Sequence, residues 1–399
     1  MDLARYRAEL RAWLDADADA DADDDGPGPG PGPGPGPDPD PTGAADDLDR
    51  RVARSRRILG RLWAADLGRW GWPERAGGLG GSPLLRAELG ATLVARDLAD
   101  PGVLAMIEVL APTVIEAAPA DRVAEWVPRL CSGAEVWCQG FSEPATGSDL
   151  AALTCRATPV GGDPATASAF VVRGQKVWTS LAQYADRCVL LARTGPAEAR
   201  HRAITAFLVD MDDPGITVAP IEMVNGAREF AEVFFDDVVV PADRILGARD
   251  GGWDLAMRIL PYERSTCFWH RIAYLEQRLA RLAAGAPADD RAALALGEAV
   301  GAVHTLRARS RATLHRLAAG ETLGPETSVD KLLVAAAELA TFDAARALLP
   351  GTVELADDPV AAGWRSEYLY SRAVTVYGGT AEIQRNIVAR RLLDLGPEG

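Results

Sequence analysis

Apolar residues recur every three to four positions in the first third of the chain and again after about residue 250, a spacing that places them on one stripe of an α-helix. In the first region, a short amphipathic helix is expected over residues 3–14 and several more helices between Asp46 and Gly133. In the last region, striped segments separated by Gly/Pro breaks predict an antiparallel bundle. Its helices are expected at about 253–284, 289–319, 328–349, 359–376 and 380–393.

Between these regions the period changes from 3.6 to 2 at Val136. Short runs rich in Val, Phe, Thr and Trp then follow at the spacing typical of an antiparallel barrel or sandwich. Pro241 ends the series, because proline cannot continue a central strand. Strands are expected at 136–142, 152–159, 169–179, 187–194, 204–210, 216–222 and 231–240.

The predicted fold class is therefore a multidomain α+β protein. The chain has 399 residues, which is too long for one ordinary core. We expect an N-terminal helical domain over residues 1–134, a middle antiparallel β-domain over 135–245 and a C-terminal helical bundle over 246–399.

A low-complexity insertion interrupts the N-terminal domain. Residues 15–25 repeat Asp-Ala and residues 26–37 repeat Gly-Pro, so neither part has side chains to bury. A period of two also excludes collagen, which needs glycine at every third position. We expect residues 15–45 to be a disordered, solvated loop between the first two helices.

A second irregular stretch carries three tryptophans, Trp63, Trp70 and Trp72, followed by the glycine-rich residues 77–81. We expect it to connect two helices, with its aromatic rings in the core.

Charge and cysteine usage narrow the possible partners. The formal charge of −15 includes nine aspartates between residues 15 and 40, so the remainder is only mildly acidic. Nucleic acid and anionic membrane surfaces both require a basic face, which argues against either as partner.

The five cysteines contain no CxxC pair, which is typical of a reducing compartment. Without a signal peptide or an apolar run of about 20 residues, a cytoplasmic protein is expected.

Four motifs stand in a characteristic order: Phe141-Ser-Glu-Pro-Ala-Thr-Gly-Ser-Asp149, Gly174-Gln-Lys-Val-Trp-Thr-Ser180, Glu263-Arg264, and Val376-Tyr-Gly-Gly-Thr-Ala-Glu-Ile-Gln-Arg-Asn386. Together they resemble the acyl-CoA dehydrogenase family of flavoenzymes over roughly residues 44–395. The resemblance implies the same order of domains, FAD as cofactor, and oxidation of a saturated acyl-CoA, or another acyl thioester, to the trans-2-enoyl thioester.

That reaction needs a carboxylate against the weakly acidic α-proton, a flavin to accept hydride, and a backbone N–H to polarise the thioester carbonyl. Many family members carry the base directly after the tyrosine of the C-terminal loop, where this chain has Gly378. A second group, which includes isovaleryl-CoA and long-chain dehydrogenases, carries it on the first bundle helix in a Glu-Arg context. The resemblance therefore implies Glu263 as base, the N–H of Gly378 on the substrate carbonyl, and Arg264 positioning either the base or the acyl-CoA. Without the resemblance, a Glu-Arg pair such as Glu263-Arg264 would be interpreted as a surface ion pair, which is the common fate of such dipeptides.

The resemblance also implies the flavin site. Trp178 would stack on the ring, Thr179 and Ser180 would lie near the nitrogen that accepts hydride, and Ser148 would also contact the substrate. Contacts with the ring edge and the pyrophosphate are expected from Phe141, Ser142, Gly147 and Ser148. Contacts near the adenosine are expected from Thr380, Glu382 and Gln384.

One expected element is missing, and it keeps alternatives open. Relatives carry an Arg-x-x-Phe-Gly segment on the second bundle helix that reaches a neighbouring subunit, whereas residues 278–290 here lack Phe-Gly. A non-catalytic partner subunit of a hetero-oligomer, or a flavin oxidase or monooxygenase, is the alternative. An electron-transfer flavoprotein-type acceptor and a dimer or tetramer, of like or unlike chains, are expected from the family.

The four histidines are too scattered to predict a metal site, and His270 is expected to be a core or interface residue.

Overall fold

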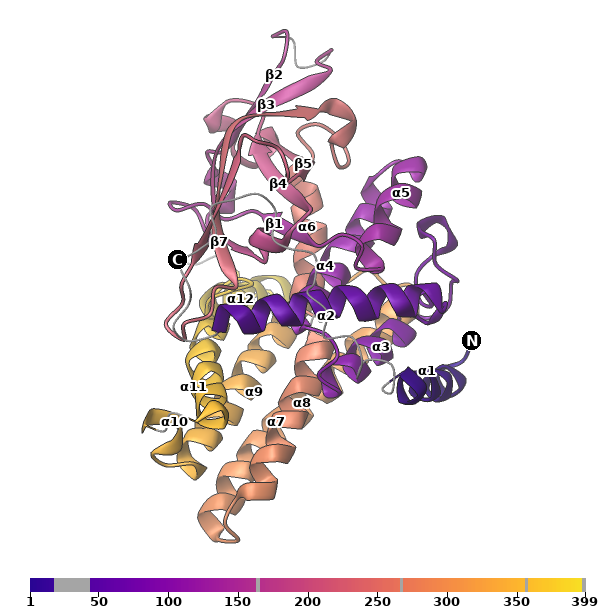
Figure 1. The fold of residues 1–399 in the computed structure, drawn as a ribbon. Coiled ribbons are helices and arrows are strands. Elements are labelled where there is room, and N and C mark those ends of the chain that lie inside the picture. The colour runs from indigo at the N-terminus through magenta and orange to yellow at the C-terminus, as the bar shows by residue number, and fades with distance from the viewer. Residues whose placement is uncertain (18–43, 163–165, 266–267, 356–357, 397–399) are drawn as a thin grey trace.

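The computed structural model describes residues 1–17, 44–162, 166–265, 268–355 and 358–396. These residues form a helical region, then a β-sheet, then a helical bundle (Figure 1). The sheet occupies one end of the molecule, the bundle extends away from it, and α2 (Ala44–Ala64) crosses between them (Figure 1). The predicted α+β architecture is confirmed, while the domain boundaries at 134/135 and 245/246 stay predictions.

Two of the N-terminal helices, α3 (Pro83–Ala95) and α4 (Pro101–Ala117), begin at side-chain caps that the sequence supplies. The Ser82 hydroxyl accepts the N–H of Leu84, and the Asp100 carboxylate accepts the N–H groups of Gly102 and Val103. Each cap is followed by proline, whose fixed φ suits the first helical position. The helices here are α1 (Leu3–Asp17), α2, α3, α4 and α5 (Ala120–Cys131).

The predicted insertion over 15–45 falls mainly on residues 18–43, which lie outside the described residues. Its boundaries were wrong at both ends. Helix α1 continues through Asp17, and α2 already begins at Ala44. Adding a residue to an existing helix is far easier than nucleating one, so α1 can continue into the first residues of the repeat, Asp15-Ala16-Asp17.

The sheet contains all seven predicted strands: β1 (Trp137–Gly140), β2 (Arg156–Pro159), β3 (Ala169–Ser180), β4 (Arg187–Arg193), β5 (Ile204–Asp210), β6 (Ile216–Ile221) and β7 (Phe230–Pro241). Their order is β1-β4-β2-β3-β7-β6, with β5 also paired to β4. Most pairs are antiparallel, as expected, but β4 runs parallel to β1 and to β2. Strand β4 is buried along its whole length, which explains its nearly continuous apolar run.

The C-terminal bundle differs from the prediction at its first helix and at a short helix over Thr352–Leu355, which was not predicted. The segment predicted as one helix over 253–284 is two, α6 (Gly252–Glu263) and α7 (Phe268–Gly285). After Pro261 the helical ladder tightens, because the N–H of Ser265 donates to Tyr262 O and its hydroxyl donates to Pro261 O. Helix α6 therefore ends at Glu263.

The rest of the bundle follows the predicted segments, with shorter helices near the end. They are α8 (Asp290–Ala318), α9 (Thr327–Leu348), α10 (Thr352–Leu355), α11 (Pro359–Ser371), η8 (Arg372–Thr375), α12 (Ala381–Ile387) and η9 (Val388–Leu392).

The tryptophan-rich connection lies against the core, as expected. Trp72 is buried, and Trp63 and Trp70 are partly buried against the same cluster. The Arg86 guanidinium stacks 3.9 Å from the Trp72 ring centroid, and its Nη1 donates to Gly71 O.

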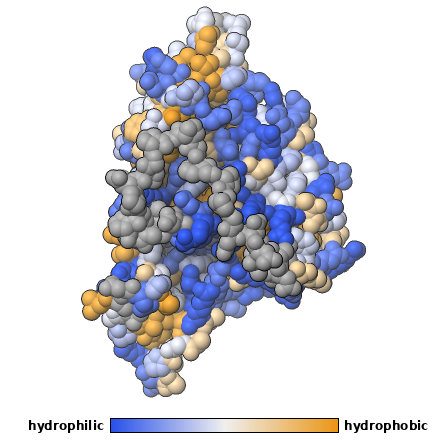
Figure 2. Space-filling model, in the orientation of Figure 1, coloured by the Kyte–Doolittle hydropathy of each residue, from blue (hydrophilic) through white to orange (hydrophobic). Residues whose placement is uncertain are grey.

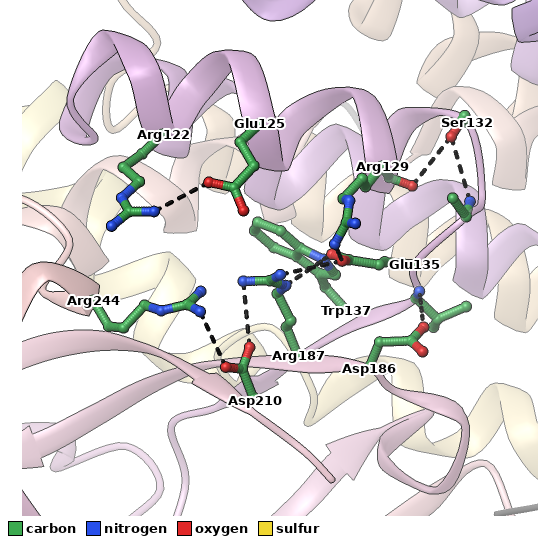
Figure 3. A network of polar contacts seen from close by, with 12 residues as sticks. Arg122, Glu125, Arg129, Ser132, Glu135, Trp137, Asp186, Arg187, Asp210 and Arg244 are labelled. Atoms are coloured by element: carbon green, nitrogen blue, oxygen red, sulfur yellow. Dashed lines mark hydrogen bonds and ion pairs between the residues drawn. The ribbon is translucent and has the colours of Figure 1, made fainter. Parts of the chain in front are cut away.

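A buried polar network joins α5 to the sheet (Figure 3). At its centre the Glu135 carboxylate accepts hydrogen bonds from Trp137 Nε1 at 2.9 Å, from Arg187 at 2.9 and 3.2 Å, and from Arg129 at 2.8 Å. Arg187 also lies 5.9 Å from the Trp126 ring centroid. The network fixes the N-terminal helices relative to the sheet and hence to the loops at its edge.

The face in Figure 2 is largely hydrophilic, with apolar surface at the lower left, where Figure 1 places α10 and α11. On these two helices Leu355 is 79% exposed and Val360 is 69% exposed. No helix within the described residues combines the length and apolarity of a membrane span. Cys131, Cys138, Cys155 and Cys188 are buried free thiols.

Candidate active site

The C-terminal loop makes a tight turn that only glycine accommodates easily. Gly378 and Gly379 have φ values of 63° and 89°, in the left-handed region. The Thr380 hydroxyl then accepts the N–H of Ile383 and caps α12. Buried Gln384 reaches back from α12, and its Nε2 donates to Gly378 O at 3.0 Å and to Gly379 O at 3.3 Å. In this chain Gln384 holds the turn; the adenosine contact expected of it stays a prediction.

Glu263 stands beside this turn. Its Oε1 is 3.3 Å from the point where a Cβ on Gly378 would lie. Its Oε2 accepts a hydrogen bond from Gln139 Nε2 on β1 at 3.4 Å. Three segments that are distant in sequence thus meet at one carboxylate: the end of α6, strand β1 and the C-terminal loop. A side chain at position 378 would crowd the carboxylate that α6 already supplies.

Lys331 approaches the same turn from α9. Its ammonium donates to Val374 O at 2.5 Å and lies 4.2 Å from the Tyr377 ring centroid. Its Cε is 3.2 Å from the Cβ position of Gly378, so Lys331 and Glu263 flank the same glycine. The side chain is only 3% exposed.

The environment of Glu263 favours its protonated form. Desolvation raises the pKa of this carboxyl above its ordinary value, and Arg264, the Gln139 hydrogen bond and Lys331 offset only part of that effect. A raised pKa is what a carboxylate needs to accept a proton from a weak carbon acid.

Arg264 follows Glu263 at the end of α6. Burial lowers the pKa of its guanidinium, Glu263 opposes this, and Arg391 adds to the lowering. Its Nη2 lies 3.6 Å from the Cβ position of Gly379. The structure therefore brings together three of the predicted residues, Glu263, Arg264 and Gly378, and the Glu263-Arg264 pair is partly buried.

The predicted flavin loop is tied to β3 by a buried ion pair that the sequence interpretation missed. Lys176 Nζ donates to Glu143 Oε1 at 2.8 Å and to Phe141 O at 3.1 Å. The N–H of Val177 donates to Ser142 O. Hydrogen bonds, and the Lys176 charge above all, outweigh desolvation and lower the pKa of Glu143. The pair holds Phe141 and Ser142 against the segment that carries Trp178.

Trp178 lies at a break in the β3–β7 ladder, where the register shifts between Lys176 and Thr179. Its φ of 58° is unusual for a bulky residue, and its side chain is 59% exposed. Phe230 meets the ring edge-on at 6.1 Å. Next to it, Thr179 is buried, and among the residues the structure describes its hydroxyl has no hydrogen-bond partner. Ser180 pairs with Phe230 on β7 and is partly buried.

Other predicted residues lie at the surface. Gly147 and Ser148 are exposed in the loop after β1, and Glu382 is exposed and lies 3.8 Å from Arg385. Their expected cofactor and substrate contacts stay predictions.

His270 is a core residue, as expected. It is 1% exposed, burial lowers its pKa to about 4, and it packs on α3 where a Cβ at Gly90 would lie 2.1 Å from its Nε2. Its Nδ1 has no hydrogen-bond partner in the described chain.

Gln139, Glu143, Lys176 and Lys331 belong to these two sites without having been predicted. The rarity of lysine in the sequence could have pointed to two of these four residues. Only two of the 42 basic residues, Lys176 and Lys331, are lysines, and both are buried here.

Two family models match the chain: the acyl-CoA dehydrogenase middle domain over residues 138–238 and the acyl-CoA dehydrogenase C-terminal domain over 250–393. Acyl-CoA dehydrogenase IpdE1 of Mycobacterium tuberculosis is 36% identical over 344 residues, which cover 85% of this chain and 87% of the relative. The mitochondrial short-chain specific acyl-CoA dehydrogenase of Homo sapiens is 28% identical over 340 residues, covering 80% and 78%. The chain therefore belongs to the acyl-CoA dehydrogenase family of flavoproteins.

Solved structures agree at the level of the fold. The Tcur3481–Tcur3483 steroid ACAD matches with a TM-score of 0.81 at 23% identity, covering 100% of this chain and 99% of that chain. The ChsE4–ChsE5 complex from Mycobacterium tuberculosis matches with a TM-score of 0.74 at 24% identity, covering 88% and 92%.

Proposed function

We propose that this chain oxidises a saturated acyl-CoA to the trans-2-enoyl-CoA, with Glu263 as the base. The observation that carries the proposal is the position of the Glu263 carboxylate. It lies 3.3 Å from where a side chain at Gly378 would begin, so α6 fills the space that many family members fill from the loop. A carboxyl group with a raised pKa stands there beside a backbone turn whose N–H groups can polarise a carbonyl.

The residues around Trp178 fit a flavin. An exposed indole held at a positive φ offers a flat apolar surface, and the adjacent buried Thr179 hydroxyl lacks a partner within the described residues. Trp178, Thr179 and Ser180 would hold the ring system, and the loop containing Phe141 and Ser142 would contact its edge. A bound FAD would supply the acceptor for the hydride from the β-carbon.

In this reaction Glu263 takes the α-proton as the α C–H bond breaks, while the β-hydrogen leaves with its electron pair and the C=C bond forms. The N–H of Gly378 would hold the thioester oxygen, where negative charge develops. Arg264 would orient the base or the acyl-CoA from the end of α6. Lys331 and Gln139 favour the ionised carboxylate that must form before the proton is accepted.

The acyl group is not defined by the residues at the site. Because the fold match includes a steroid ACAD, a steroid-derived acyl-CoA belongs in the first panel of substrates, beside straight and branched chains. An electron-transfer flavoprotein-type acceptor and a cytoplasmic location complete the proposal.

A second candidate is a non-catalytic partner subunit of a hetero-oligomer. It is favoured by the absence of the Phe-Gly segment in residues 278–290 and by structural matches to complexes of two named chains. Oxygen-dependent rather than dye-dependent turnover would instead indicate a flavin oxidase or monooxygenase on the same fold.

An anaerobic visible spectrum of the purified chain, before and after each acyl-CoA is added, tests the proposal. Bleaching of a flavin band by one acyl-CoA is the expected result. A flavin-loaded chain that no acyl-CoA in the panel bleaches would contradict it, and a colourless chain that takes up no added FAD would favour the partner subunit.

A further inference from the structure

Lysine is nearly absent from this chain, and Lys331 is one of only two in the sequence. A lysine ammonium is a compact point charge, whereas a guanidinium is a wide planar fork. The compact ammonium lies between the Tyr377 ring, Val374 O and the Gly378 turn, and it donates a short hydrogen bond to Val374 O.

Helix α9 holds the C-terminal turn at two points. The first is the contact of Lys331 with Val374 O. The second lies two helical turns further along, where fully buried Glu338 accepts a hydrogen bond from the Tyr377 hydroxyl at 3.5 Å. Glu338 is itself fixed by two hydrogen bonds from Arg271, at 2.8 and 3.1 Å. Contacts with helix α9 thus hold the backbone on either side of Gly378 in place.

Two cations act on the Glu263 carboxylate among the described residues: Arg264, at the end of its own helix, and Lys331, from α9. Strand β1 contributes the neutral Gln139. Arg391 acts on Arg264 from beyond α12. Of the two cations, Arg264 lies toward Gly379 and Lys331 lies across Gly378 from the carboxylate.

We propose that Lys331 is a positioning residue for proton abstraction: it fixes the turn that carries Gly378 and presents its ammonium charge to the Glu263 carboxylate. The inference rests on the proposed function, in which Glu263 is the base. The Lys331 charge favours the ionised form of Glu263 in spite of burial, and its contact with Val374 O holds the turn that carries the Gly378 N–H. The proton itself goes to Glu263.

The first test needs neither flavin reduction nor substrate. Because the chain has two lysines, biosynthetic labelling with ε-¹³C-lysine gives two side-chain NMR signals, and Lys331→Met identifies one by its loss. The Lys331 signal is expected to shift as Glu263 titrates, and this step should vanish in Glu263→Gln. The Lys176 signal, whose partner is Glu143, should not respond to Glu263→Gln. A Lys331 titration identical with and without Glu263 would overturn the proposal.

The second test follows substrate-driven flavin reduction against pH. In Lys331→Met, Glu263 loses a neighbouring cation, so the acidic limb of the profile should move to higher pH and reduction at acidic pH should slow roughly tenfold. Lys331→Arg keeps the charge and should keep the limb near its original position. The control is Arg309→Met. It removes an ion pair between Arg309 on α8 and Asp330, the neighbour of Lys331 on α9, and it should leave the acidic limb unmoved.

A uniform loss of rate at every pH in Lys331→Met, with the acidic limb unmoved, would mean that the lysine supports only the turn, and it would overturn the proposal that its charge acts on Glu263. The two hypotheses fail separately. If no acyl-CoA reduces the flavin of the unaltered chain, the proposed function fails, whereas the lysine signal still decides whether Lys331 and Glu263 are coupled.

Discussion

Glu135 and Glu263 are both carboxylates largely removed from water, yet their surroundings act in opposite directions. At Glu135 desolvation is outweighed by hydrogen bonds from Trp137, Arg187 and Arg129, and the pKa falls below its ordinary value (Figure 3). At Glu263 desolvation dominates over Arg264, Gln139 and Lys331, and the pKa rises. Both residues have cations nearby, so the presence of an arginine does not distinguish them.

The difference is in how the ionised form is solvated by the protein. Glu135 receives short, charge-assisted hydrogen bonds to both oxygens, which replace the lost water. Glu263 receives a long hydrogen bond from a neutral amide, and its two cations lie across the Gly378 turn (Lys331) and toward Gly379 (Arg264). A satisfied carboxylate stabilises a domain junction, whereas an under-solvated one can exchange a proton.

The largest effect is expected from Glu263→Gln. The amide fills the same space but cannot accept the α-proton, so substrate-driven flavin reduction should fall by roughly 10²- to 10⁴-fold, the usual contribution of a general base. Stopped-flow absorbance under anaerobic conditions measures it, and the flavin content of the variant serves as control. Near-normal reduction would remove Glu263 from the mechanism.

Arg187→Met tests the structural side of the comparison. It leaves the Glu135 carboxylate buried without its bidentate partner, and the free energy of unfolding should fall by about 3 kcal/mol. Urea or thermal unfolding followed by circular dichroism measures the loss.

The matched control is Arg129→Met, because the Arg129 side chain is 54% exposed and contacts the same carboxylate. Its cost should be about 1 kcal/mol or less. Equal costs for the two substitutions would mean that burial does not set the strength of this network.

Gly378→Ala should cost about 1–2 kcal/mol, because a left-handed φ is strained for any residue with a Cβ. The new methyl group would also press on Lys331 Cε and Glu263 Oε1, so flavin reduction should slow as well. Gly297→Ala is the control: it lies in α8 with open space around it and should be neutral or slightly stabilising. If both variants behave alike, the turn does not constrain the site.

The smallest effect is a difference in how stability depends on pH. Because the folded-state pKa of Glu135 is lowered, its stabilising contribution is present above the unfolded pKa and is lost as pH falls through the folded value. The folded-state pKa of Glu263 is raised, so its contribution is full below the unfolded pKa and is lost as pH rises through the folded value.

Glu135→Gln should therefore destabilise the chain more at neutral than at acidic pH, and Glu263→Gln should stabilise it at neutral pH and have little effect at acidic pH. Urea unfolding at a series of pH values measures both. If the free energy of unfolding of the two variants changed with pH in the same way, the proposed difference between Glu135 and Glu263 would be contradicted.

Local patterns predicted the strands well because each is a short period-2 run ended by turn residues. The single helix predicted over 253–284 failed for a comparable local reason, since Pro261 and Ser265 end α6 without interrupting its apolar stripe. That break matters for function, because it places Glu263 at a helix end, where its side chain can reach the C-terminal loop.

The sequence by itself determined the order of helical and β regions, the glycine turn at 378–379, and Glu263 and Trp178 as candidates, because these depend on periodicity, on backbone freedom and on motifs contiguous in the chain. The tertiary structure alone decided that Lys331, Gln139 and Gly378 surround one carboxylate, and that Lys176 holds the loop predicted to contact flavin through Glu143. These partners lie between 33 and 124 residues apart where they form hydrogen bonds, and no local pattern encodes such distances. Their effect on ionisation arises only when folding removes the water between them.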